Sequence, residues 1–236
     1  MKKVVYRLLN NKGMSLVELV VAMFLTSVIL TIAMGLLVPV KNLMNTLKSN
    51  AHMDTISSTV EEYIRGTLQT AKNLKFITLG DDNSVDAHVS DITDFFNKNG
   101  SKSRALAVLN VSDDDTPLYR IYDFEYVSDY STLKGLLNKY SANEYRVFND
   151  AFYEGTSCAV EFYKAGSTRL QVASQCYRNG ESINRKHVLS FNLLNGGSTG
   201  IASDIDGEGV YTNVDIEAQT DIEGHCYLIL YTLNEI

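Results

Sequence analysis

The chain has 236 residues, of which 45% are hydrophobic, so it can bury a core and form one large or two small domains. Its formal net charge is −7, although four basic residues, Lys2, Lys3, Arg7 and Lys12, lie within the first twelve positions. The chain beyond these twelve positions is therefore acidic. This excludes broad nucleic-acid binding, because contacts to phosphates need a basic surface.

The first element predicted in chain order is a helix that crosses a membrane. Residues 1–12 contain those four basic residues and no acidic residue, and residues 19–40 contain no charged residue at all. A segment of about 20 apolar residues is long enough to span the hydrocarbon core as a helix. Because only Lys41 and Lys48 follow soon after it, the charge distribution predicts that the N-terminus stays inside and that the chain beyond about residue 41 is exported.

The start of this segment, "KGMSLVELVVAMFLTSVILTIAMGLL" at residues 12–37, resembles the signal of type IV pilins and pseudopilins. In that family a short basic leader ends in glycine, the cut follows the glycine, and a glutamate stands five places after the cut. The resemblance places Gly13 at the end of the leader, Met14 at the start of the mature chain and Glu18 at the assembly position. It implies cutting and N-methylation by a prepilin peptidase, with Met14 where the family usually has phenylalanine.

Glu18 needs a partner, because a carboxylate at the centre of a membrane helix costs roughly 2.5 to 3.5 kcal/mol on insertion scales, though less near a helix end. A cut after Gly13 would create a positive amine on Met14, about 6 Å from Glu18 along a helix. In a bundle of parallel helices, this amine can pair with Glu18 of a neighbouring subunit and favour one axial offset between subunits. We therefore predict that Glu18 guides assembly.

Two other interpretations of the same segment stay open. A secretory signal would be cut after its apolar run, and the small residues at 33–35 offer such a position. A plain signal anchor would never be cut. Neither interpretation gives Glu18 a role.

The helix is predicted to continue beyond the membrane segment as an amphipathic helix. Apolar residues recur mostly every three or four positions from Leu43 to Leu74, and Glu61 is expected among the polar residues on the other sides. Pro39, with Gly35 nearby, predicts a kink or a melted segment near residues 35–39. The predicted organisation is a leader at 1–13, a transmembrane and assembly half of the helix at 14–40, an amphipathic half at 41–77 and an exported head at 78–236.

The predicted head consists of short segments separated by turns. We expect short helices near residues 90–96 and 131–140, the second with Ser131 as its N-cap. Alternation predicts strands within residues 104–111, 118–127, 158–176, 187–194, 209–217 and 225–233. The predicted fold class is α+β, with a long N-terminal helix packed on a C-terminal antiparallel β-sheet head, and this is also the architecture of the pilins that the chain resembles.

Two of the three cysteines, Cys158 and Cys176, lie at the two ends of the predicted hairpin. They face each other if the hairpin has a three-residue turn, which makes them a candidate disulfide. In an exported head such a bond would stabilise the fold by roughly 3 kcal/mol. Buried free thiols, or a bond to Cys226, remain the alternatives.

Two further motifs resemble sites of known chemistry. "GGSTG" at residues 196–200 matches the G-x-S-x-G pattern of hydrolases, but turn-forming residues follow Ser198 where that fold requires a helix. We therefore expect no enzyme. Asp204, Asp206 and Glu208 in "DIDGEG" are candidate calcium ligands, and no other cofactor is expected.

The resemblance implies a structural subunit, a minor pilin, of a bacterial type IV pilus or related pseudopilus. Such a subunit resides in the cytoplasmic membrane and then in an extracellular filament. Its implied partners are prepilin peptidase, other pilin subunits, the inner-membrane assembly platform and, before assembly, the lipid bilayer. The alternative function is a signal-anchored extracellular binding or adhesin domain that does not polymerise.

Overall fold

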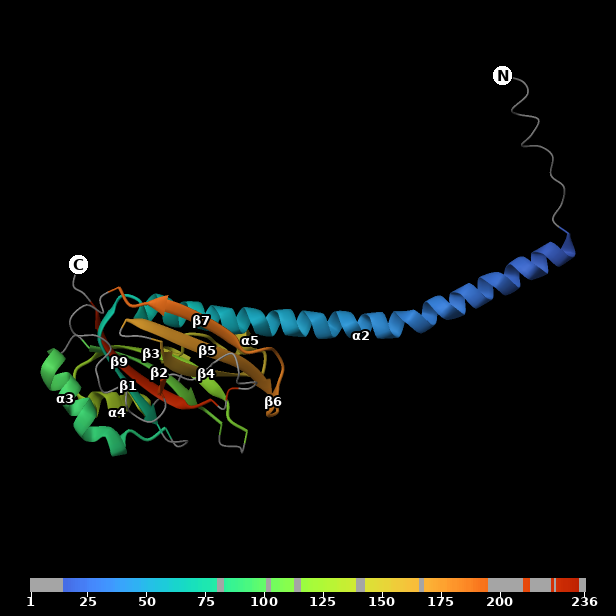
Figure 1. The fold of residues 1–236 in the computed structure, drawn as a ribbon. Coiled ribbons are helices and arrows are strands. Elements are labelled where there is room, and N and C mark those ends of the chain that lie inside the picture. Colours follow the sequence, from blue (N-terminus) through green and yellow to red (C-terminus); the bar gives the residue numbers. More distant parts are fainter. Residues whose placement is uncertain are drawn as a thin grey trace, which may run out of the picture. The chain divides into compact units, whose positions relative to one another are not determined.

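The computed structural model describes residues 15–79, 83–100, 103–112, 116–138, 143–165, 168–194, 210–212, 222 and 224–233. The chain divides into two compact units, residues 1–49 and 50–236. Helix α2 (Leu16–Leu68) contributes to both units, and all the described strands belong to the second (Figure 1).

Helix α2 ends at Leu68, earlier than predicted, and the next residues form strand β1 (Ala71–Leu79). The predicted helical boundary at residue 77 is therefore wrong. Strand β1 pairs antiparallel with β9 (Cys226–Leu233), and Asn73 has a left-handed φ of 51° where the register shifts. Pairing with a distant strand outweighs the helical periodicity that continues through Leu74, because β-branched and aromatic residues in this segment suit a buried sheet.

The first sheet has four strands in the order β1, β9, β2 (Ser103–Asn110) and β3 (Tyr119–Val127), all antiparallel. Strand β9 lies in the interior of this sheet, and its residues 226–232 are all buried. The predicted strands within 104–111, 118–127 and 225–233 are thereby confirmed.

The second sheet is built on the hairpin of β4 (Ser157–Lys164) and β5 (Arg169–Arg178), which was predicted. Its other strands are β6 (Glu181–Ser182), β7 (His187–Asn192) and β8 (Val210–Thr212). Both β6 and β7 pair with β5, whereas β8 runs parallel to β4. The predicted antiparallel head is confirmed, and it consists of two sheets in which the pairing of β8 with β4 is parallel. Most of the strand predicted at 209–217 lies outside the described residues.

Three short α-helices accompany the sheets, namely α3 (Val89–Asn99), α4 (Tyr130–Leu137) and α5 (Asp150–Tyr153). The first two confirm predicted helices. The N-cap of α4 is Asp129, not Ser131, because the Asp129 carboxylate accepts a hydrogen bond from the Thr132 N–H at 2.7 Å. Two 3₁₀ turns, η1 (Asp86–His88) and η3 (Asn143–Tyr145), complete the described helical structure.

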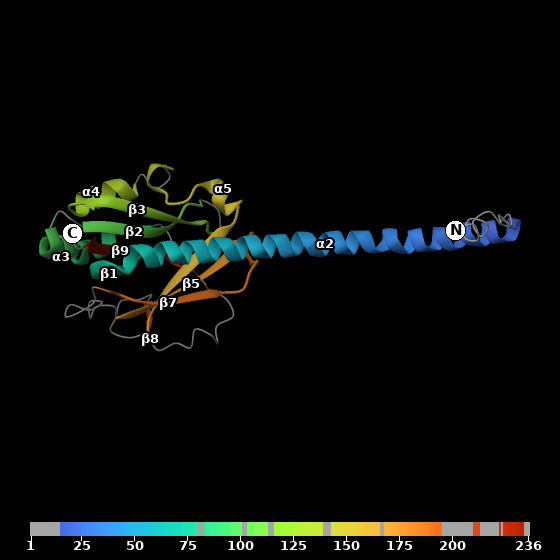
Figure 2. The ribbon, with the colours of Figure 1, turned by 90° about the horizontal axis from the view of Figure 1, so that it is seen from above.

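Within the second unit, the last part of α2 packs against strands of both sheets (Figure 2). The Tyr63 hydroxyl donates to Asp123 of β3 at 2.7 Å, and the Ser174 hydroxyl of β5 donates to Glu61 at 2.6 Å. The apolar residues that α2 buries are Met53, Ile56, Val60, Ile64 and Leu68. A helix packed on a β-rich domain confirms the predicted α+β class.

Candidate functional site

The first turn of α2 holds the predicted assembly residue, Glu18. The Ser15 N–H donates to Glu18 Oε2 at 2.9 Å, and the Glu18 N–H donates to Ser15 Oγ at 3.2 Å. This reciprocal pair is a capping box, which satisfies two of the N–H groups that a helix start leaves without intrahelical acceptors. The sequence analysis missed Ser15, although the S-x-x-E spacing in "SLVE" is the recognised signal for it.

The capping box explains locally why a carboxylate can stand at the edge of an apolar segment. Its negative charge lies in the first turn of the helix, where the helix dipole is positive, so the position favours an anion. Gly13 and Met14 lie outside the described residues. Pairing between a Met14 amine and Glu18 therefore stays a prediction.

Exposed apolar side chains cover α2 from Leu16 to Leu47. Their exposed fractions reach 80% at Leu16 and remain 58% at Leu47. By length and composition, α2 is able to cross a membrane. An apolar surface of this extent needs lipid or protein to cover it, so we identify Leu16–Leu47 as the candidate assembly segment.

The hydroxyl groups in this segment are compatible with an apolar surrounding. Thr26, Ser27 and Thr31 each donate to a backbone carbonyl three or four residues earlier, at 2.7 to 2.8 Å. A hydroxyl bonded in this way carries no unsatisfied donor into lipid.

Helix α2 remains helical through Pro39 and Gly35 (Figure 1). Of the kink or melted segment predicted near residues 35–39, the melted segment is therefore wrong, and the kink stays a prediction. Proline removes one backbone donor, and a helix can absorb that single loss when the turns on both sides keep their hydrogen bonds.

The calcium candidates Asp204, Asp206 and Glu208 lie outside the described residues, as does Ser198. Among the residues that the structure does describe, no group of three or more His, Cys, Asp or Glu side chains is arranged to hold a metal ion.

A buried polar seam runs between α2 and β5. Glu61, expected on a polar side of the helix, is only 5% exposed. Burial raises the pKa of Glu61 to about 7, although the hydrogen bond from Ser174 and the charge of His187 oppose the shift. The expectation was wrong because position 61 lies one residue after Val60 and four after Ser57, both of which face the sheets.

The seam continues toward the start of the second unit. Asp54 Oδ1 lies 3.2 Å from His187 Nε2, and Asn184 Nδ2 donates to Asp54 Oδ1 at 3.3 Å and to Ser57 Oγ at 3.1 Å. Asp54, Asn184 and His187 border an open cavity of about 610 Å³. Its walls contain one carboxylate, Asp54, and two cationic side chains, Arg185 and Lys186.

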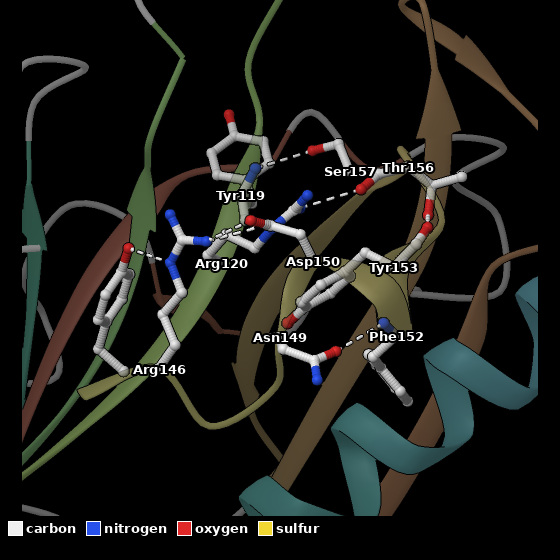
Figure 3. A network of polar contacts seen from close by, with 10 residues as sticks. Tyr119, Arg120, Arg146, Asn149, Asp150, Phe152, Tyr153, Thr156 and Ser157 are labelled. Atoms are coloured by element: carbon white, nitrogen blue, oxygen red, sulfur yellow. Dashed lines mark hydrogen bonds and ion pairs between the residues drawn. The ribbon is translucent and has the colours of Figure 1, made fainter. Parts of the chain in front are cut away.

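A second polar cluster joins the two sheets (Figure 3). Arg120 of β3 is buried, and its Nη1 donates to the backbone oxygens of Tyr119 at 2.8 Å and Thr156 at 2.9 Å. Its Nε donates to Asp150 Oδ1 at 3.3 Å. The guanidinium carbon also lies 4.0 Å from the centre of the Tyr153 ring.

Arg146 binds the same carboxylate (Figure 3). Its Nη1 lies 2.9 Å from both oxygens of Asp150, and its Nε donates to the Tyr122 hydroxyl at 3.0 Å. Burial alone would raise the pKa of Asp150, but the hydrogen bonds and charges of Arg120 and Arg146 outweigh it and lower this pKa. With the carboxylate ionised at neutral pH, the cluster acts as a structural brace between the sheets.

Cys158 and Cys176 are direct partners in the register of β4 and β5. The Ala165 N–H donates to the Arg169 carbonyl at 3.0 Å, which leaves three residues, 166–168, at the tip of the hairpin. This is the turn length on which the predicted pairing depends. Both thiols are unbonded and buried in the structure, so the disulfide stays a prediction.

Comparison with protein families matches residues 8–34 to the "Prokaryotic N-terminal methylation motif". The matched range contains Gly13, Met14 and Glu18, and it confirms the resemblance to the type IV pilin and pseudopilin signal. No curated protein and no solved structure matches the chain. The match covers the start of the chain, which is consistent with a membrane-anchored precursor.

Proposed function

We propose that this chain is a minor pilin of a bacterial type IV pilus or related pseudopilus, because it carries the cutting and methylation signal of type IV pilins and pseudopilins. The observation that supports this most directly is the family match at residues 8–34. This range includes the start of the apolar helix α2, whose first turn contains Glu18. The proposal assigns no catalytic activity and no cofactor to the chain.

The first step in this function is insertion and cutting. Four basic residues precede the apolar segment, so the N-terminus is held inside and the second unit is exported. Prepilin peptidase then cuts after Gly13 and methylates the new amine of Met14. Methylation retains the positive charge that Glu18 is proposed to bind.

The second step is assembly. Lipid covers the exposed segment Leu16–Leu47 before assembly, and the same segments of neighbouring subunits replace that lipid in the filament. Because apolar contacts have little directional preference, the paired Met14 amine and Glu18 carboxylate supply the axial offset. Met14 in place of phenylalanine and the size of the head favour a minor over a major subunit.

Mass spectrometry of the N-terminus tests this proposal. Protein from its native host is expected to begin at N-methylated Met14 and to be present in sheared filaments. A Gly13→Leu variant, expected to keep its leader, is the matched control for cutting. A wild-type chain that still begins at Met1 would contradict the proposal and favour the anchored binding domain.

A further inference from the structure

We propose that Cys158 and Cys176 form a disulfide in the exported protein, which closes the β4–β5 hairpin beneath helix α2. The proposal depends on the proposed function only for the compartment, since disulfides persist on the exported side of a membrane and are reduced in the cytoplasm. The pairing itself follows from the sheet register and the surrounding contacts.

The backbone shows which kind of cross-strand pair these cysteines form. The Cys176 N–H donates to Asn184 Oδ1 at 2.8 Å, and the Cys176 carbonyl accepts from the Ile183 N–H at 2.9 Å. Both backbone groups thus point away from β4, so Cys158 and Cys176 are a non-hydrogen-bonded pair. In such pairs the Cα atoms lie about 4.5 Å apart and the side chains are closest, within the Cα separation that a disulfide accepts.

Each thiol also affects the pKa of the other: the neighbouring sulfur raises the pKa of Cys158 and lowers the pKa of Cys176. On the other side, Cys176 Sγ contacts Ser57 Oγ at 3.4 Å and the Met53 carbonyl at 3.6 Å. The sulfur atoms therefore lie at the interface between the hairpin and α2.

The burial of both cysteines implies that the disulfide forms before α2 packs on the hairpin. Cys158 is 2% exposed and Cys176 is fully buried once α2 covers the hairpin. An oxidant can reach them only before α2 is in place, and the same burial afterwards protects the bond from reductants. The disulfide therefore forms during folding and is structural.

The reaction requires a disulfide as oxidant, for example oxidised glutathione or a disulfide oxidoreductase. The thiolate of one cysteine attacks a sulfur of the oxidant and releases one thiol. The second thiolate then attacks the mixed disulfide and releases the other thiol. The protein loses two protons and two electrons, and the oxidant becomes two thiols.

Cys226 lies apart from this pair. It belongs to β9 in the other sheet, where its register partner is Leu79. A bond from Cys226 to either cysteine would have to connect the two sheets. Cys226 is therefore the matched control.

The test uses the full chain from its native host. Thiols are blocked with N-ethylmaleimide in denaturant on lysis, and the protein is then reduced and labelled with a maleimide polymer that shifts its mobility. Two labels are expected for the wild type and for Cys226→Ser, and none for Cys158→Ser or Cys176→Ser. Peptide mass spectrometry of the unreduced wild type should find the linked Cys158 and Cys176 peptides.

Protease digestion of cells with the outer side of the cytoplasmic membrane exposed, done on the same sample, separates the two proposals. A cleaved, exported head without labels, or a linked peptide that contains Cys226, would overturn the disulfide and leave the proposed function intact. A protected head would overturn the proposed function instead. In that case, refolding the purified chain in a glutathione buffer would test the proposed disulfide. A Cys158–Cys176 link in the refolded chain would support the disulfide, and three free thiols would overturn it.

Discussion

Glu18 has two roles that can be separated at the scale of single residues. It accepts the Ser15 N–H in a capping box, and it is proposed to bind the Met14 amine of a neighbouring subunit. The first role needs only a hydrogen-bond acceptor, which glutamine can also provide. The second role needs a negative charge.

Glu18→Gln is therefore expected to keep helix α2 and the cut after Gly13 but to reduce incorporation into filaments at least tenfold. An ion pair lost from an apolar bundle costs more than about 1.4 kcal/mol, which corresponds to that factor. Immunoblots of sheared filaments against the cell fraction measure the incorporation.

Ser15→Ala is the matched control for Glu18. It removes the capping hydroxyl and keeps the carboxylate, so incorporation should stay within about fivefold of wild type, because a lost N-cap costs only about 1 kcal/mol. If Ser15→Ala were as defective as Glu18→Gln, the role of Glu18 would lie in capping.

Glu61 makes the stability of the protein depend on pH. Its pKa is raised from 4.5 to about 7 in the folded chain, so the folded state binds more protons than the unfolded state between these values. The free energy of unfolding should therefore fall as pH rises from about 4.5 to about 7, by at most about 3 kcal/mol.

Glu61→Gln should remove this pH dependence and stabilise the chain above pH 7, because the amide is neutral and can still accept from Ser174. Glu62→Gln, half exposed in an ion pair with Arg65, should leave the wild-type slope unchanged. Denaturant unfolding of the full chain at pH 5 and pH 8 measures both. A wild-type slope that survives Glu61→Gln would refute the assignment.

At the scale of elements, the brace around Arg120 connects β3 with α5 and the start of β4. Arg120→Ala should lower the free energy of unfolding by about 1–3 kcal/mol, because it leaves buried carbonyl oxygens without donors and removes the contact with Tyr153. Urea unfolding followed by tyrosine fluorescence measures the change.

Lys134 provides the comparison, since its ion pair with Asp86 joins two half-exposed side chains. Lys134→Ala should change stability by less than about 0.5 kcal/mol. Equal effects of the two substitutions would mean that the brace contributes no more than a surface ion pair.

The exposed apolar part of α2 is expected to determine membrane insertion. Ile29→Lys places a charge in the middle of the apolar run and costs about 2.5–3.5 kcal/mol on insertion, so the carbonate-resistant membrane fraction should fall. Ser58→Lys, at an exposed position of α2 beyond the candidate assembly segment, should leave the fraction unchanged. Equal extraction of both variants would argue against a membrane-spanning segment.

At the scale of the whole molecule, the sequence predicted those features that depend on local patterns. The hairpin of β4 and β5, the strand β9 and the buried residues Ile56, Val60 and Ile64 all follow from short periodicities. The candidate assembly segment could also be predicted from the sequence, because an uncharged run after a basic leader is recognised without knowledge of tertiary contacts.

Features that depend on distant partners were not predictable in this way. Residues 71–79 continue a helical spacing and become a strand only because β9 pairs with them. The buried Glu61 carboxyl accepts a hydrogen bond from Ser174, which lies 113 residues further along the chain, and β8 lies parallel to β4 across a long connection. A single sequence contains no signal for such pairings.

The place of β9 in the first sheet has a consequence for synthesis. The strand that lies between β1 and β2 leaves the ribosome after both of them, so both neighbours must wait with open edges while residues 111–225 are synthesised. Premature termination before residue 226 would remove the middle of the sheet.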